Sequence, residues 1–371
     1  MSGSTFAIWT LISVFCPHDW PPPEAPADAD WYAALRAAQA LLETEQHLRV
    51  PERQRLLLAR LRTWLAELAP GGHLPAPERA AAADVLARLD DPRPGVGLRR
   101  DGLPDIVWCE VPIGPFTMGS GGDPDAWEDE SPQHEQSILH AYRISKYPII
   151  NAQFSAFVQD GGYANPDYWT EAGWQWRESN DVTEPQTYGG VFDLLNHPVV
   201  GVSWYEAVAF CRWLMDKLGV EARLPSEAEW EKAARGTDGR RYPWGDEPDP
   251  NRANYDETGI GTTSAVGIFP SGQTPYGCLD MSGNVWEWTR SLWGKDLSEP
   301  SFKYPYDPTD GREDLSAGND VCRVLRGGAF SALVGAFAAR FASGSSRSRY
   351  LGFRVVVSPV ISPLASGSSG L

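Results

Sequence analysis

The hydrophobic pattern changes near residue 103, and this change constrains the fold more than any other feature. Residues 31 to about 91 carry apolar side chains at helical spacing and are expected to form three short amphipathic helices. After residue 103, short apolar runs alternate with turns rich in Gly and Pro, which is typical of short strands and loops. We expect an N-terminal helical module with its linker at 1–95, an α+β domain at 103–358 and a flexible tail at 359–371.

Three helices are expected inside the second part. Ser203 and Glu206 are three residues apart at the start of an apolar-periodic run, which is a capping box. Ser226 and Glu229 form a second capping box of the same spacing, and Gly236 lies where the helix that follows would end. A third helix is expected over the apolar run that begins at 151. Few helices among many short strands indicate the α+β class.

Charge and cysteine content limit the partners and the compartment. The chain has 49 acidic and 32 basic residues, a net charge of −17, so a nucleic-acid partner is not expected. The five cysteines are scattered and contain no CxxC pair, which favours a reducing, cytoplasmic environment over a disulfide framework.

The apolar run Phe6–Phe15 is too short to span a bilayer, and no basic residue precedes it. We interpret it as a buried segment, with a signal peptide as the alternative. No membrane partner is expected, and the oligomeric state stays open.

Eight motifs occur in order in the second part. They are VPIGPFTMGS from Val111, DESPQHE from Asp129, HPVVGVSWYEAVAFCRWL from His197, RLPSEAEWEKAARG from Arg223, YPWGDE from Tyr242, GNVWEWT from Gly283, RVLRGG from Arg323 and LGFRVV from Leu351. Together they resemble the formylglycine-generating-enzyme (sulfatase-modifying factor) family over about residues 104–358. The resemblance implies a C-type-lectin-like fold.

The family's enzymes hold copper with two cysteines that follow the GG pair, because soft thiolates select Cu(I). The matching positions here are Ala332 and Phe337, and residues 329–350 contain no cysteine. Cys322 lies upstream and matches neither position. A related group, the ergothioneine-type sulfoxide synthases, uses a three-histidine iron site, and the six histidines here lack its spacing.

These absences lead us to expect a non-catalytic protein without copper. The alternative is a formylglycine-generating-enzyme-like oxidoreductase or an inactive relative of it. The pair His134 and His140 is interpreted as surface or hydrogen-bonded loop residues, with a metal site as the alternative.

One metal site is implied by the resemblance. The side chains of Asp280 and Glu287, with the carbonyls of Gly283 and Val285, would bind structural Ca²⁺, which prefers oxygen ligands. The alternative is that these carboxylates hydrogen-bond within a tight loop that holds no ion. A second family calcium site would begin at Asn254, but the loop that completes it is short.

The stretch from 326 to 356 begins and ends with family motifs, whereas residues 329–350 between them match no motif. Family members with this fold include the variable proteins of diversity-generating retroelements, in which adenines of the C-terminal coding segment are randomised, mostly at asparagine codons. Such replacement cannot give Lys, Glu, Gln, Met or Trp, and residues 329–350 contain none of them. This resemblance implies a diversified display surface for an unknown protein or other macromolecular ligand. A degenerate loop on an inactive enzyme relative is the alternative.

The expected ligand-binding residues are Phe330, Ser331, Ala332, Leu333, Val334, Gly335, Phe337, Ser343, Gly344, Ser345, Ser346, Ser348 and Tyr350. Phe330 and Phe337 could instead belong to the core. Arg340 and Phe341 are assigned to the scaffold.

Overall fold

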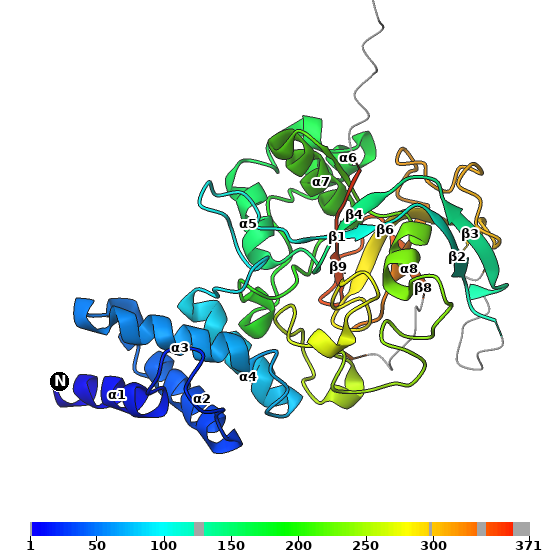
Figure 1. Cartoon of the computed structure of the whole chain (residues 1–371). Coiled ribbons are helices and arrows are strands. Elements are labelled where there is room, and N and C mark those ends of the chain that lie inside the picture. The colour runs from blue at the N-terminus through cyan, green and yellow to red at the C-terminus, as the bar shows by residue number, and fades with distance from the viewer. Residues whose placement is uncertain (1, 122–129, 297–298, 332–338, 359–371) are drawn as a thin grey trace, which may run out of the picture.

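The N-terminal part of the chain is a bundle of four helices (Figure 1). The computed structural model describes residues 2–121, 130–296, 299–331 and 339–358, and the expected tail lies outside them. The helices are α1 (Ser2–Phe15), α2 (Asp28–Glu43), α3 (Arg55–Leu68) and α4 (Ala76–Leu89). Three of them confirm the helices expected from periodicity. The fourth, α1, covers the N-terminal apolar run and buries Ile8, Trp9 and Ile12, as the buried-segment interpretation requires.

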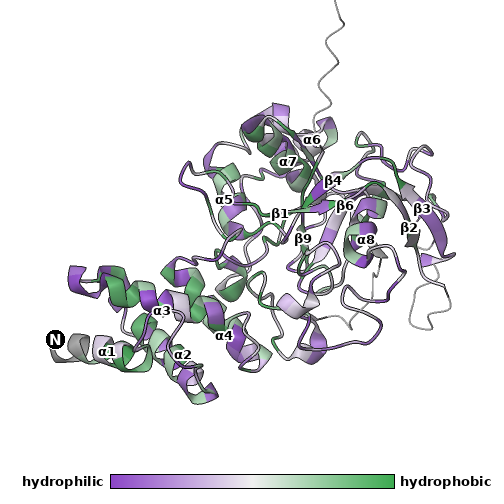
Figure 2. Ribbon diagram, viewed as in Figure 1, coloured by the Kyte–Doolittle hydropathy of each residue, from purple (hydrophilic) through white to green (hydrophobic). Residues whose placement is uncertain are grey.

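The core of this bundle is aromatic. The rings of Trp31 and Trp64 lie 5.4 Å apart, and Trp20 from the connection between α1 and α2 packs on both. The ribbons of α2, α3 and α4 carry both apolar and polar residues (Figure 2), as expected for helices with one buried side.

Helix α4 joins the bundle to the second part (Figure 1). Its alanines share a small core with Ala265, Ile268 and Phe269. Arg79 is buried, and its guanidinium donates to the carbonyl of Ile268 at 2.5 Å. Asp84 of α4 accepts from Nε2 of the buried His197 at 2.9 Å. Apolar contact and polar pairing therefore connect the two parts.

In the residues that the structure describes, the second part combines short helices with three small sheets, and the α+β expectation is confirmed. One sheet has the order β1-β4-β10-β5, the second pairs β2 with β3, and the third has the order β8-β7-β6-β9 with β9 parallel to β6. The elements are β1 (Trp108–Val111), β2 (Gly114–Met118), β3 (His134–Ile138), β4 (Tyr142–Ser145), α5 (Asn151–Gln159), α6 (Glu171–Ser179), α7 (Trp204–Leu218), β5 (Glu221–Arg223), α8 (Glu227–Arg235), β6 (Trp286–Gly294), β7 (Cys322–Arg326), β8 (Ala339–Ser343), β9 (Leu351–Phe353) and β10 (Val356–Ser358).

Both expected capping boxes are present. Ser203 accepts from the backbone N–H of Glu206 at the start of α7, and Glu206 accepts from the backbone of Ser203 in return. Helix α8 begins in the same way at Ser226 and ends at Gly236, whose φ of 77° suits glycine. Local sequence therefore decides where these helices begin.

Among the residues that the structure describes, no helix has the length and apolar character needed to cross a bilayer.

Candidate functional site

The segment from 326 to 356 starts on a rigid base. Arg326 at the end of β7 is 1% exposed and pairs with Glu231 at 2.6 Å and Glu227 at 3.3 Å, both on α8. Gly327 has a φ of 101°, and a Cβ there would lie 3.0 Å from the ring of Trp230. A side chain at Gly327 would be strained by this φ and would crowd Trp230, which explains the definite start of the segment.

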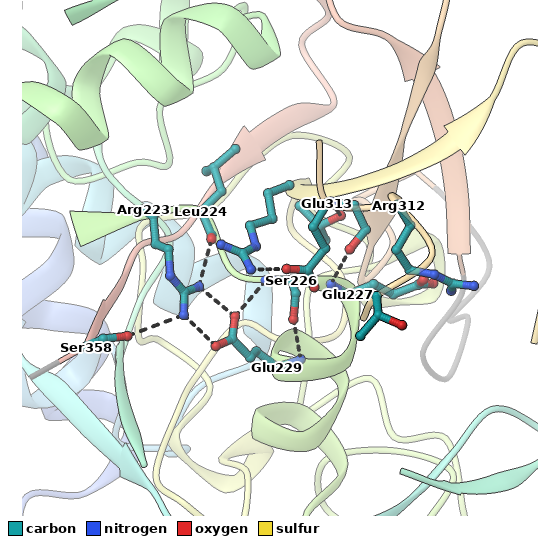
Figure 3. Close-up of polar contacts among 12 residues, drawn as sticks. Arg223, Leu224, Ser226, Glu227, Glu229, Arg312, Glu313 and Ser358 are labelled. Atoms are coloured by element: carbon teal, nitrogen blue, oxygen red, sulfur yellow. Dashed lines mark hydrogen bonds and ion pairs between the residues drawn. The ribbon is translucent and has the colours of Figure 1, made fainter. Parts of the chain in front are cut away.

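Helix α8 is held by a second charged network (Figure 3). Arg223 donates from its two terminal nitrogens to Glu229, both at 2.7 Å, and reaches the hydroxyl of Ser358 at 3.3 Å. Burial alone would raise the pKa of Glu229, but the charge and hydrogen bonds of Arg223 hold that pKa far below its ordinary value. This carboxylate thus stays ionised, and its pair with Arg223, which also reaches Ser358, joins β5, α8 and β10.

The end of the segment is fixed by an arginine that sequence reasoning missed. Arg347 donates from Nε to Glu206 at 2.9 Å, and its guanidinium lies 5.2 Å from the ring centre of Trp176. Glu206 is fully buried and also accepts from the hydroxyl of Tyr163. Arg347 is the counter-ion of a carboxylate that the sequence shows only as a helix cap.

A cluster of aromatic rings lies between these two ends. Phe330 packs on Phe192 at 5.8 Å and on Tyr350 at 5.1 Å, and Tyr188 follows at 6.1 Å from Phe192. Phe330 is 2% exposed, which agrees with the core alternative, and its role in ligand binding stays a prediction. Tyr188, Phe192 and Tyr350 are half-buried and form the accessible part of the cluster, which we call the aromatic face.

The polar residues expected to bind ligand fall into two groups. The first group is accessible: Ser331 is exposed, and Ser346 and Ser348 are half-buried. The second group is Ser343 and Ser345. Ser343 donates from its hydroxyl to Oδ1 of Asn319 at 2.8 Å, and the same oxygen accepts from the backbone of Ser345 at 3.0 Å. The second pair therefore holds a turn.

Gly344 is buried, and a Cβ there would lie 2.9 Å from the guanidinium of Arg323, so its place on a binding surface stays a prediction. The expected ligand residues Ala332, Leu333, Val334, Gly335 and Phe337 lie outside the described residues. Phe341 on β8 stacks on Trp293 at 4.3 Å, in agreement with its scaffold assignment.

A cavity of about 240 Å³ adjoins the aromatic face through Phe192. Its floor is apolar, with Phe154 and Val158 of α5, and its rim carries Glu184 and Asp193. The lining residues are Asn151, Phe154, Ser155, Val158, Gln159, Glu184, Pro185, Gln186, Thr187, Phe192, Asp193, Leu195, Val199 and Val200.

The expected calcium ligands lie close together, but Glu287 already has a counter-ion. Both of its oxygens accept from Arg354, at 2.6 and 2.7 Å, and one accepts from Trp230 at 2.7 Å. Asp280 accepts from the backbone N–H of Gly267 at 2.8 Å. In this arrangement both carboxylate oxygens of Glu287 accept hydrogen bonds, which matches the alternative of a tight loop. Calcium at Asp280, Gly283, Val285 and Glu287 stays a prediction.

His134 and His140 do not form a pair. His134 accepts at Nε2 from the backbone of Tyr306 at 2.9 Å, whereas His140 lies 2.9 Å from Glu229. Within the described ranges no group of three His, Cys, Asp or Glu side chains could hold a metal ion. The hydrogen bonds agree with the interpretation of these histidines as loop residues.

Comparison with known proteins decides the family. The sulfatase-modifying factor enzyme 1-like domain matches residues 99–359. The chain belongs to this family. Its relatives include the formylglycine-generating enzyme of Thermomonospora curvata, 34% identical over 270 residues, covering 59% of this chain and 81% of that protein. The hercynine oxygenase of Mycolicibacterium thermoresistibile is 34% identical over 244 residues, covering 58% of this chain and 50% of that protein.

A solved structure agrees with the fold assignment. PvdO from Pseudomonas aeruginosa is 22% identical, with a TM-score of 0.52, and the match covers 72% of this chain and 99% of that one. At this identity the likeness concerns the fold alone.

These relatives correct the expectation of a non-catalytic protein. Proteins about one third identical to this chain are named as enzymes, which favours an enzyme here. The expectation rested on two missing thiols. Their absence removes one way of holding copper, and the base of the segment at Arg326 and Gly327 is present.

Proposed function

We propose that this chain is an oxidoreductase domain of the formylglycine-generating-enzyme type. The observation that carries the proposal is the 34% identity to the Thermomonospora curvata enzyme, with 81% of that protein covered. The chain spans about half the length of the hercynine oxygenases that it matches, so an activity like theirs belongs to the same proposal.

A metal used in such a reaction would need ligands other than the family's pair of cysteine thiols. The segment 329–350 has no cysteine, and the five thiols of the chain are buried elsewhere. The residues present therefore do not fit copper at the family's position.

The substrate would lie on the aromatic face. Half-buried rings of Tyr188, Phe192 and Tyr350 suit a planar or apolar group, because stacking and burial both stabilise such contacts. Arg349 is exposed beside them, with its guanidinium 5.1 Å from the ring centre of Tyr350, and it could pair with a carboxylate of the substrate.

Oxygen consumption tests this proposal. The full chain is supplied with Fe(II) or Cu(I) and with a cysteine-containing sulfatase-type peptide or with hercynine and a thiol. We expect metal-dependent oxygen uptake with one of these two substrates, and a product whose mass differs from that of the substrate. Arg349→Ala is expected to lower kcat/KM about tenfold or more, the loss of one charged hydrogen bond. Arg143→Ala, an exposed arginine on β4, is the matched control. Uptake at background level with every substrate would contradict the proposal.

We further propose that residues 329–350 are the variable, ligand-contacting part of this domain. Support comes from their restricted residue types and from the exposed Ser331 and half-buried Ser346 and Ser348. A near-copy of the 3′ coding end that differs at adenines, next to a reverse transcriptase gene, is expected in the adjoining DNA. Its absence would leave the degenerate-loop alternative.

A further inference from the structure

Two cysteines from distant parts of the sequence meet in one core of the second part. Cys109 lies on β1, and Cys278 lies in the loop before β6. They are 7% and 0% exposed, and both belong to the apolar cluster around Trp230 and Tyr142. Neither residue belongs to the aromatic face or to the charged networks of α8.

Backbone hydrogen bonds at Lys146 bring the two segments together. The N–H of Lys146 donates to the carbonyl of Val107, just before β1, and its carbonyl accepts from the N–H of Leu279, each at 2.8 Å. The N–H of Cys278 donates to Oγ1 of Thr274 at 3.2 Å, which holds the loop closed. Cys109 and Cys278 are therefore neighbours because of a fixed backbone frame.

The two thiols lie close together. A Cβ placed on Gly277, the residue before Cys278, would lie 3.9 Å from the Sγ of Cys109, which brings the two thiols within reach of a hydrogen bond to each other.

The surroundings favour the thiolate at Cys109. The hydrogen bond from Cys278 lowers the pKa of Cys109 to about 7, and the positive charges of Arg354 and Lys146 act in the same direction against burial. Burial raises the pKa of Cys16, Cys211 and Cys322. Among the five cysteines, only Cys109 is poised as a nucleophile near neutral pH.

We propose that Cys109 and Cys278 form a redox site that is reversibly oxidised to a disulfide, with a peroxide as the oxidant. The Cys109 thiolate attacks one peroxide oxygen, the O–O bond breaks, and for hydrogen peroxide the products are the sulfenic acid of Cys109 and hydroxide. The sulfur of Cys278 then displaces the sulfenic oxygen, which leaves as water with the Cys278 proton. The hydroxide takes up the proton that Cys109 released on ionising. Overall, two thiols and one hydrogen peroxide give one disulfide and two waters.

The exposure of the pair suits this division of roles. Cys109 is the more exposed of the two residues, at 7% against 0%, so the proposal assigns it the reaction with the small peroxide molecule and assigns Cys278 the role of resolving thiol. The new bond would join β1 to the loop that leads into Asp280 and β6. It would cross-link two segments far apart in the chain, so it should stabilise the fold by restricting the unfolded state.

Peptide mapping tests the proposal on the full chain. The reduced protein is treated with hydrogen peroxide near neutral pH, alkylated and digested without reductant. We expect a linked peptide pair containing Cys109 and Cys278, a mass lower by two hydrogen atoms, and reversal by dithiothreitol. Higher oxides of Cys109 without the link, or a link between other cysteines, would overturn the proposal.

Matched variants separate the pair from the other thiols. Cys211→Ser removes a fully buried cysteine on α7 and should leave the link unchanged. Cys109→Ser should abolish the link and leave Cys278 unoxidised. If Cys109→Ser does not fold, the measurement on the unaltered chain still decides, supplemented by the pH dependence of Cys109 alkylation. An alkylation rate of Cys109 whose pH midpoint equals that of an ordinary thiol would count against the redox site. None of these readouts depends on oxidoreductase activity.

Discussion

At the scale of single residues, Asp280 shows how burial makes stability depend on pH. Burial raises the pKa of Asp280 to about 6, above the value of an unfolded aspartate. The folded state therefore holds this proton more tightly, so the contribution is favourable below pH 4 and is lost as pH rises towards 6.

We expect Asp280→Asn to increase the free energy of unfolding at pH 7.5 by up to about 3 kcal/mol, and by less at pH 5. An amide oxygen can still accept from the N–H of Gly267, so the loop contact remains. Urea unfolding in calcium-free buffer measures the difference. A variant that is less stable at both pH values would contradict the explanation.

Calcium binding at the same loop has a direct test. A ligand that binds only the native state raises the melting temperature, so EGTA should lower it and added Ca²⁺ should restore it. A melting temperature unchanged by EGTA would mean that Arg354 alone neutralises Glu287.

At the scale of elements, Arg347 holds the end of the 326–356 segment against α7. Arg347→Ala would leave the fully buried carboxylate of Glu206 without its counter-ion. We expect a loss of about 3–5 kcal/mol in the free energy of unfolding, measured by urea denaturation. Arg349→Ala is the matched control, because its exposed side chain should change stability by no more than about 0.5 kcal/mol. Equal effects of the two substitutions would contradict the anchoring role.

At the scale of the whole molecule, α4 couples the helical bundle to the second part. Ala80 is 6% exposed in the core shared with Ile268 and Phe269. We expect the unaltered chain to unfold in one calorimetric transition. Ala80→Asp places a charge in this core and should separate the bundle's transition from that of the second part. Ala59→Asp on the exposed side of α3 should keep a single transition. Two transitions in the unaltered chain would show that the parts are independent.

Local sequence was enough for features that depend on near neighbours. The capping boxes at Ser203 and Ser226 and the turn at Gly236 involve residues a few positions apart, so their backbone geometry follows from local hydrogen bonding. The ordered motifs likewise led to the family and its α+β fold. They did not reveal whether the chain is an enzyme, because a missing thiol pair is compatible with more than one chemistry.

Tertiary structure alone decided which distant side chains meet. Arg347 pairs with Glu206, His197 pairs with Asp84, and Cys109 lies beside Cys278, although long stretches of chain separate the members of each pair. Phe330 is buried because rings from two separate loops cover it. No periodicity encodes such contacts, since they depend on how complete elements pack against one another and on which charges that packing removes from water.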